Sequence, residues 1–272
     1  MMTTATAHPL LEVDRVSKSY RSRPRGLTRR RTVAPAVIEA SFDINQGRVV
    51  GLVGESGSGK TTIGRIVLGL VPLDRGEVRY RGEALAPVLE ERPTAVTRSL
   101  TAVFQDPGTS LNPRMNALQI VSEPWRVVRL NLSRADTRDR VVDLLRQVGL
   151  PDDTLGRRPP ELSGGQQQRL AIARALALEP RLVVADEALS ALDVSVQAQI
   201  LHLLGRLVDE RDLSMLFISH DLSVVQLLCD DVVVLQEGRV VESGPTGEVL
   251  SSPSHEYTRF LMEVRPRLEL TG

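Results

Sequence analysis

A glycine-rich segment between an apolar run and a helical run limits the possible folds of this chain more than any other feature. The segment is GESGSGKT, Gly54–Thr61, followed by Thr62. The run before it, Val49–Val53, is short, apolar and rich in β-branched residues, which predicts a buried strand. The run after it, Ile63–Leu68, predicts a helix. A strand, a glycine-rich loop and a helix in this order predict a phosphate-binding P-loop in an α/β fold.

The loop chemistry suits a nucleoside triphosphate. Its glycines let the backbone fold around the β-phosphate, Lys60 would bridge the β- and γ-phosphates, and the Thr61 hydroxyl would bind Mg²⁺. A chance match in a glycine-containing turn is the alternative, and the strand before the loop argues against it. The residues expected to bind the nucleotide here are Gly54, Glu55, Ser56, Gly57, Ser58, Gly59, Lys60, Thr61 and Thr62.

A second apolar run ends in two acids. Leu182–Ala185 are four apolar residues in a row, which is typical of a strand buried on both faces of a parallel sheet. Asp186 would emerge at the carboxyl end of this strand, beside the P-loop, and hold Mg²⁺. Glu187 would then polarise the attacking water. An exposed acidic pair at a strand end is the alternative.

A second phosphate-binding surface is predicted in ELSGGQQQR, residues 161–169. Ser163 precedes Gly164 and Gly165 at the expected start of a helix, where backbone N–H groups and a hydroxyl face outward. No lysine accompanies this surface, unlike the P-loop.

These motifs and their order resemble the nucleotide-binding subunits of ATP-binding-cassette (ABC) transporters, over about residues 10–260. LSGGQ, which ends at Gln166, is similar to the signature sequence of that family. Tyr20 resembles the aromatic residue that stacks on adenine, although it could be an ordinary exposed aromatic. Gln105 resembles the Q-loop glutamine, Asp193 belongs to a D-loop-like SALD, and His220 resembles the switch histidine. A histidine that merely ends a strand is the alternative for His220.

The resemblance implies a fold and a mechanism. The fold would be a P-loop NTPase: a RecA-like core with an N-terminal antiparallel β subdomain and an inserted helical subdomain. Two subunits would pack head to tail, so that the ATP held by Lys60 is covered by the signature of the partner. Glu187 would orient water, His220 and Gln105 would sense the γ-phosphate, and Thr61, Gln105 and Asp186 would hold Mg²⁺.

Three further segments resemble the dipeptide, oligopeptide and nickel importers: residues 104–114 (FQDPGTSLNPR), 191–201 (ALDVSVQAQIL) and 255–259 (HEYTR). The SLNPR form indicates the second of two paralogous ATPases. The resemblance thus implies a heterodimer, two transmembrane permease subunits, an external substrate-binding protein, and a peripheral position on the cytoplasmic face of the membrane. Peptides, nickel and metal chelates all stay open as cargo, as does export.

Several positions depart from the family pattern. Ala188 and Leu189 replace a Pro and a Thr beside the expected catalytic acid, and Gly108 stands where relatives often have an aromatic residue. Many relatives carry a C-terminal cysteine cluster, whereas Cys229 is the only cysteine here. One thiol cannot hold an iron–sulfur cluster, so we expect Cys229 to be a small core residue.

Composition excludes some classes of protein. The 272 residues carry 34 Lys and Arg against 34 Asp and Glu, and this zero net charge argues against nucleic-acid binding. No apolar run approaches the roughly 18–20 residues of a membrane span. The arginine cluster at 21–31 is best interpreted as a solvated hairpin insertion, with contact to anionic lipid or a membrane subunit as the alternative. Its members are Arg21, Arg23, Arg25, Arg29, Arg30 and Arg31.

The expected domain organisation follows from these elements. An ATPase domain would cover residues 10–250, with its core at 10–110 and 180–250 and its helical subdomain at 111–179. Within the latter, Ser133 and Asp136 predict a helix start. Residues 251–272 would be a short polar extension.

Rival functions stay open. A non-transport ABC ATPase, such as a subunit of a carbon–phosphorus lyase complex, would carry the same motifs. A DNA-repair ABC ATPase would need a long coiled coil, and no sustained heptad pattern is present. A small GTPase or nucleotide kinase would not explain LSGGQ.

Overall fold

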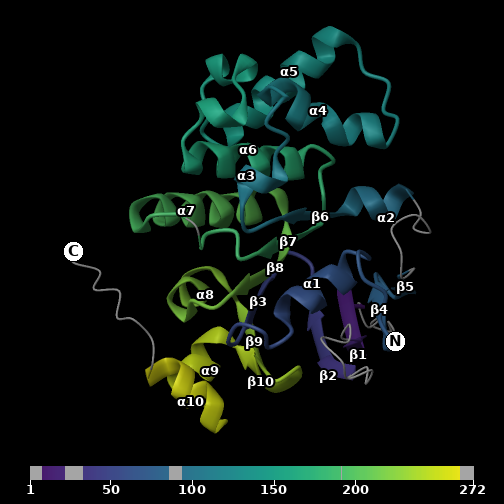
Figure 1. Ribbon diagram of the computed structural model, residues 1–272, viewed down its shortest axis with the longest axis vertical. Helices are drawn as coiled ribbons and strands as arrows, with labels where there is room; N and C mark the ends of the chain where they lie inside the picture. The colour runs from purple at the N-terminus through teal and green to yellow at the C-terminus, as the bar shows by residue number, and fades with distance from the viewer. Residues whose placement is uncertain (1–7, 22–32, 86–93, 191, 264–272) are drawn as a thin grey trace, which may run out of the picture. The chain divides into compact units, whose positions relative to one another are not determined.

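The computed structural model describes residues 8–21, 33–85, 94–190 and 192–263 (Figure 1). The chain forms two compact units, one made of residues 1–92 and 214–272 and the other of residues 93–213. The arginine cluster falls outside the described residues, except for the backbone of Arg21. No helix in the described ranges is both long and apolar enough to cross a bilayer.

Within the described residues, the first unit contains an antiparallel sheet, a row of strands that includes the P-loop strand, and four short helices. The antiparallel sheet has the order β2-β1-β4-β5, made of β1 (Leu11–Arg21), β2 (Val33–Ile44), β4 (Arg75–Tyr80) and β5 (Glu83–Ala84). The other strands run β10-β9-β3-β8, made of β3 (Val49–Val53), β8 (Ser214–Ser219), β9 (Asp231–Gln236) and β10 (Arg239–Pro245). The helices are α1 (Lys60–Val67), α8 (Leu222–Leu228), α9 (Thr246–Ser251) and α10 (Glu256–Glu263).

Strand β3 lies between β8 and β9, is parallel to both, and is buried along its whole length. A Cβ atom on Gly51 would lie 2.8 Å from Val225 Cγ1 and 3.0 Å from Cys229 Sγ, so a glycine lets α8 and the residue after it pack closely on β3. Burial raises the pKa of the Cys229 thiol. The expectation that Cys229 is a core residue is confirmed.

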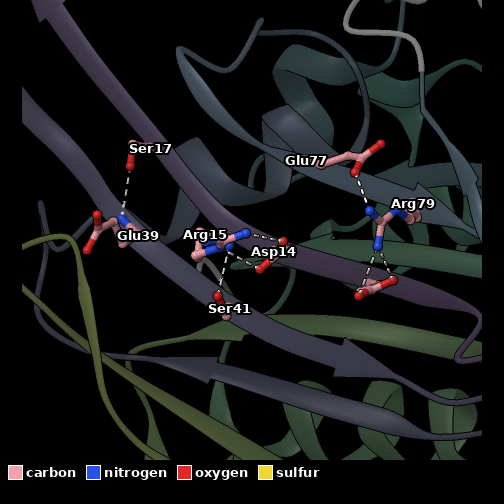
Figure 2. A network of polar contacts seen from close by, with 8 residues as sticks. Asp14, Arg15, Ser17, Glu39, Ser41, Glu77 and Arg79 are labelled. Atoms are coloured by element: carbon pink, nitrogen blue, oxygen red, sulfur yellow. Dashed lines mark hydrogen bonds and ion pairs between the residues drawn. The ribbon is translucent and has the colours of Figure 1, made fainter.

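The pairing of β1 with β2 contains an irregularity that side chains stabilise (Figure 2). Arg15 and Glu39 adopt left-handed backbone conformations, with φ of 46° and 50°. Their backbone N–H groups donate across the two strands to serine hydroxyls, Arg15 to Ser41 Oγ at 2.8 Å and Glu39 to Ser17 Oγ at 3.0 Å. The hydroxyls thus replace ladder hydrogen bonds that the bulge removes.

The second unit contains two parallel strands and a group of helices around α6. The strands are β6 (Leu100–Val103) and β7 (Leu182–Asp186). The helices are α2 (Thr94–Ser99), α3 (Pro107–Ser110), α4 (Ala117–Val127), α5 (Arg134–Gln147), α6 (Gly164–Leu176) and α7 (Val194–Arg211), with 3₁₀ turns at Asp152–Gly156 and Pro159–Glu161. Helix α6 contacts β6 and the helices α3, α4, α5 and α7.

Local signals explain where several elements begin. Ser133 is the N-cap of α5 and accepts from the backbone N–H of Asp136 at 3.1 Å, as predicted. The predicted strands at 49–53 and 182–185 match β3 and β7. In contrast, the C-terminal segment predicted only as a polar extension contains α10, whose Tyr257 and Thr258 are buried.

Candidate functional site

The P-loop connects β3 to α1, and its shape requires glycine at two positions. Gly54 and Gly59 have φ of 148° and 109°. A Cβ atom would lie 2.1 Å from the Leu235 carbonyl oxygen at Gly54, and 2.3 Å from the Ala36 carbonyl oxygen at Gly59. No side chain fits at either place, because backbone occupies the space.

The loop surrounds a buried cation. Lys60 is 4% exposed, and its Nζ donates to the carbonyl oxygens of Gly54 at 2.7 Å and Glu55 at 2.8 Å. Helix α1 begins at Lys60 without a side-chain cap. The Ser58 hydroxyl is buried and has no hydrogen-bond partner among the described residues. A lysine, an uncapped helix N-terminus and an unpaired hydroxyl in one loop suit an anion such as phosphate.

Histidine 220 lies next to the P-loop. In the parallel register Val53 pairs with Ser219, so the P-loop and His220 continue from neighbouring strand ends. Asp221 is the N-cap of α8, and its backbone N–H donates to Ser219 Oγ at 2.9 Å. The chain on both sides of the exposed His220 is therefore held in place.

Tyr20 lies on β1 and is 42% exposed. The Lys18 ammonium lies 5.9 Å from the centroid of its ring and also forms an ion pair with Asp74 at 2.8 Å. An exposed ring on a strand is compatible with base stacking and with an ordinary surface position. The adenine contact stays a prediction.

In the second unit, the expected metal and water-orienting residues share one edge. Val103 of β6 pairs with Ala185 of β7, so Asp186, the last residue of β7, and Gln105, two residues beyond β6, lie at neighbouring strand ends. Carboxylate and amide oxygens at such an edge form a donor set suited to Mg²⁺. Thr61 belongs to the first unit, and the Mg²⁺ site expected from Thr61, Gln105 and Asp186 stays a prediction.

Glutamate 187 has a strained backbone, with φ of 47°. Its carbonyl oxygen accepts from both the backbone N–H and the hydroxyl of Ser190, at 3.1 and 3.0 Å. The intervening Ala188 and Leu189 are buried, which explains why apolar residues fit there. A non-glycine residue in the left-handed backbone conformation costs roughly 1–3 kcal/mol, and such strain often marks a functional position.

The LSGGQ segment begins α6, and Ser163 is its N-cap. Ser163 N donates to Gln166 Oε1 at 3.0 Å, and Gln166 N donates to Ser163 Oγ at 3.3 Å, which forms a capping box. The two glycines between them differ. A Cβ on Gly165 would lie 2.6 Å from Val196 Cγ1 of α7, whereas one on Gly164 would meet only Leu192 at 3.6 Å. Gly165 permits helix packing, and Gly164 keeps the first turn open.

Asp193 is the N-cap of α7. Its carboxylate accepts from the backbone N–H of Val196 and the hydroxyl of Ser195, both at 2.9 Å. These two hydrogen bonds, the first above all, lower the pKa of Asp193. These contacts are those of a helix cap, and the nucleotide contact of Asp193 stays a prediction.

Two glutamines that the sequence analysis missed hold the loops before α6 and α7. Gln167 Nε2 donates to the carbonyl oxygens of Pro159 and Leu162, at 2.9 and 3.1 Å. Gln197 Nε2 donates to those of Leu189 and Leu192, at 3.0 and 3.1 Å. Each glutamine is the fourth residue after a helix N-cap, and this spacing is the sequence signal by which both could have been found.

We expect Gln197→Glu to loosen the D-loop-like segment, because a carboxylate would face two carbonyl oxygens in place of an N–H donor. The expected loss is about 1–3 kcal/mol of unfolding free energy, together with reduced ATP turnover in the assembled complex. Chemical denaturation and an ATPase assay measure both. Gln199→Glu is the matched control, since within the described part of the chain the Gln199 side chain accepts one bond, from Arg169 at 3.2 Å, and a carboxylate keeps it. Equal behaviour of the two variants would contradict this role of Gln197.

Comparison with known proteins agrees with this geometry. The family model described as "ABC transporter" matches residues 37–190, which include the P-loop, the LSGGQ segment and Glu187. This chain belongs to the ABC transporter family. As an ABC-type ATP-binding protein, it is an ATPase with a P-loop NTPase fold, as the sequence predicts.

Curated relatives cover most of the chain. The oligopeptide transport ATP-binding protein OppF of Streptococcus mutans is 46% identical over 85% of this chain and 75% of its own length. A putative peptide import ATP-binding protein of Brucella ovis is 45% identical over 96% of this chain and 80% of its own length.

Solved ABC ATPases have the same fold. The cbiO1 protein from Clostridium perfringens, part of the transporter complex cbiONQ, superposes with a TM-score of 0.76 at 27% identity, covering 90% of this chain and 91% of its own. The ATP-binding cassette MJ0796, solved as a dimer bound to ADP and Pi, gives 0.75 at 29% identity, covering 87% of this chain and 98% of its own.

Proposed function

We propose that this protein is the ATP-hydrolysing subunit of an ABC importer for dipeptides or oligopeptides. The observation that carries the proposal is the extent of its likeness to peptide-import relatives, at 45–46% identity over 85–96% of the chain. The same likeness favours peptides over nickel or metal chelates as cargo. It also supports a peripheral position at the membrane, with two permease subunits and an external binding protein as partners.

In the proposed mechanism the P-loop binds the phosphates of ATP. The residues that fit this role are the Lys60 ammonium, the first turn of α1 and the Ser58 hydroxyl. The oxygen ligands that Mg²⁺ prefers would come from Thr61, Gln105 and Asp186. The bound ion would neutralise part of the phosphate charge. Glu187 orients the attacking water, and His220 and Gln105 sense the γ-phosphate.

The signature segment serves the ATP of another subunit in this proposal. Ser163, Gly164 and Gly165 begin a helix with its N–H groups pointing along the axis, but no lysine belongs to this loop. MJ0796 was solved as a dimer, which supports pairing of such cassettes. The SLNPR segment favours a paralogous ATPase as the partner, so that the assembled pair is a heterodimer.

Co-purification and transport assays test the importer assignment. We expect the chain to co-purify with two multi-span membrane proteins. When that complex is reconstituted in vesicles with its binding protein, a peptide mixture should stimulate ATP hydrolysis and nickel should not. Stimulation by nickel alone would contradict the peptide assignment, and a complex without membrane proteins would contradict the importer assignment.

We also expect the purified chain alone to hydrolyse ATP slowly, because its P-loop then lacks a partner signature. Adding the paralogous ATPase and permeases should raise the turnover per P-loop by at least about tenfold, in line with the loss of a transition-state contact worth about 1.4 kcal/mol or more. A phosphate-release assay across protein concentrations measures this. Full turnover by a dilute monomer would contradict the shared-site arrangement.

A further inference from the structure

One peptide unit in the P-loop is held from both sides. The Gly54 carbonyl oxygen accepts from Lys60 Nζ at 2.7 Å, and the backbone N–H of the next residue, Glu55, donates to the Tyr257 hydroxyl at 2.9 Å. The carbonyl and N–H of a trans peptide point in opposite directions. Lys60 and Tyr257 therefore fix the same peptide unit from its two opposite edges, although Tyr257 comes from the C-terminal helix.

The Tyr257 side chain is itself held in place. It is 7% exposed, and its ring stacks on Phe260 with centroids 6.4 Å apart. Burial raises the pKa of Tyr257, so the hydroxyl stays neutral at physiological pH. The ring and its hydroxyl therefore form a fixed acceptor rather than a mobile surface group.

Glu242 of β10 fixes the start of α10. Its carboxylate accepts from the backbone N–H groups of Ser254 at 2.7 Å and His255 at 3.1 Å. Burial by itself would raise the pKa of Glu242, but the nearby Thr258 hydroxyl and these two N–H groups outweigh it and lower the pKa. The carboxylate is therefore charged near neutral pH, and it ties the segment that carries Tyr257 to the sheet.

We propose that Tyr257 is a positioning residue for nucleotide binding, which holds the Gly54–Glu55 peptide so that its carbonyl oxygen keeps the Lys60 ammonium in place. This inference rests on the proposed role of Lys60 in binding ATP. If the N–H end of this peptide loses its acceptor, the plane can rotate and Gly54 O turns away from Lys60. The C-terminal helix thereby contributes to the affinity for ATP without contacting the nucleotide.

Tyr257→Phe removes the hydroxyl and keeps the ring, so it tests this role directly. We expect ATP to bind about three- to tenfold more weakly, the range for loss of one neutral hydrogen bond. The KM of the assembled complex for ATP should rise by the same factor, while kcat at saturating ATP changes by less than about twofold. Tyr80→Phe is the matched control, because the Tyr80 hydroxyl is also buried in the first unit and has no hydrogen-bond partner among the described residues.

Binding is measured on the full chain with a fluorescent ATP analogue, and amide hydrogen exchange reports on Glu55. Faster exchange at Glu55 in Tyr257→Phe, with weaker ATP binding than in Tyr80→Phe, supports the proposal. ATP affinity equal to that of Tyr80→Phe, or weaker binding with unchanged exchange at Glu55, overturns it. Lys60→Ala tests the P-loop role separately from the role of Tyr257. Wild-type ATP affinity in Lys60→Ala contradicts the proposed role of Lys60 in binding ATP. If Lys60→Ala loses affinity, the P-loop role stands, and the Tyr257→Phe result bears on Tyr257 alone.

Discussion

Replacing Glu187 with Gln is expected to reduce ATP turnover in the assembled transporter by about 10²- to 10⁴-fold while ATP binding is retained. The amide keeps the shape of the side chain but cannot accept a proton from water. Gln and Glu have side chains of the same shape, so the left-handed conformation of residue 187 costs about the same free energy with either residue. The stability of the fold should therefore stay close to that of the wild type. Phosphate release and ATP-analogue binding, measured on the same complex, check both halves of this expectation.

Glu179→Gln provides the matched control. Glu179 lies in the same unit, between α6 and β7, and also has a left-handed backbone with φ of 51°. It is exposed and outside every motif assigned to the site. We expect wild-type turnover in Glu179→Gln. Wild-type turnover in Glu187→Gln would contradict its role, provided that the paralogous ATPase carries the equivalent substitution so that its site cannot sustain the rate.

The second large effect is expected for Gly54→Ala. The added methyl would lie 2.1 Å from the Leu235 carbonyl oxygen of β9, which is backbone and cannot move without breaking strand pairing. We expect a loss of about 3 kcal/mol or more in unfolding free energy, together with loss of ATP binding. Urea denaturation and nucleotide binding by the purified chain measure the two effects.

Gly57→Ala measures the cost of the backbone conformation alone, without a clash. Gly57 also has a positive φ, 84°, but a Cβ there would meet nothing within 4 Å. We expect it to cost only the strain of a left-handed alanine, about 1–2 kcal/mol. If Gly54→Ala were as stable as Gly57→Ala, the close approach of Leu235 would not be what demands glycine at position 54.

Much of the fold was predictable because its strongest signals are local. The apolar run Val49–Val53, the glycine loop and the SxxD cap at Ser133 each determine an element through contacts within a few residues. The family motifs then fixed the order of the remaining elements. Helix α10 was missed because only two of its eight residues, Tyr257 and Thr258, are buried, which leaves a weak periodic signal.

The candidate site was predictable in its residue types but not in its supporting contacts. Lys60, Glu187 and Ser163 could be assigned from motifs, since phosphate and water chemistry requires those groups. The roles of Gln197 and Tyr257 depend on which carbonyl or N–H lies opposite them. Tyr257 and Glu55 are 202 positions apart, and only the folded chain brings them together.

The pairing of β3 also determines the order in which the protein can fold during synthesis. Strand β3 ends at Val53, yet its two neighbours, β8 and β9, begin only at Ser214 and Asp231. At about 5–20 residues per second, this apolar strand has no partner on either side for roughly 8 to 32 s after it is made. The second unit is continuous, so all of its contacts are available once residue 213 has emerged. The signature segment can therefore be in place before β8 and β9, the two strands that flank the P-loop strand, have been made. Until then β3 is an unpaired apolar strand that needs chaperone protection.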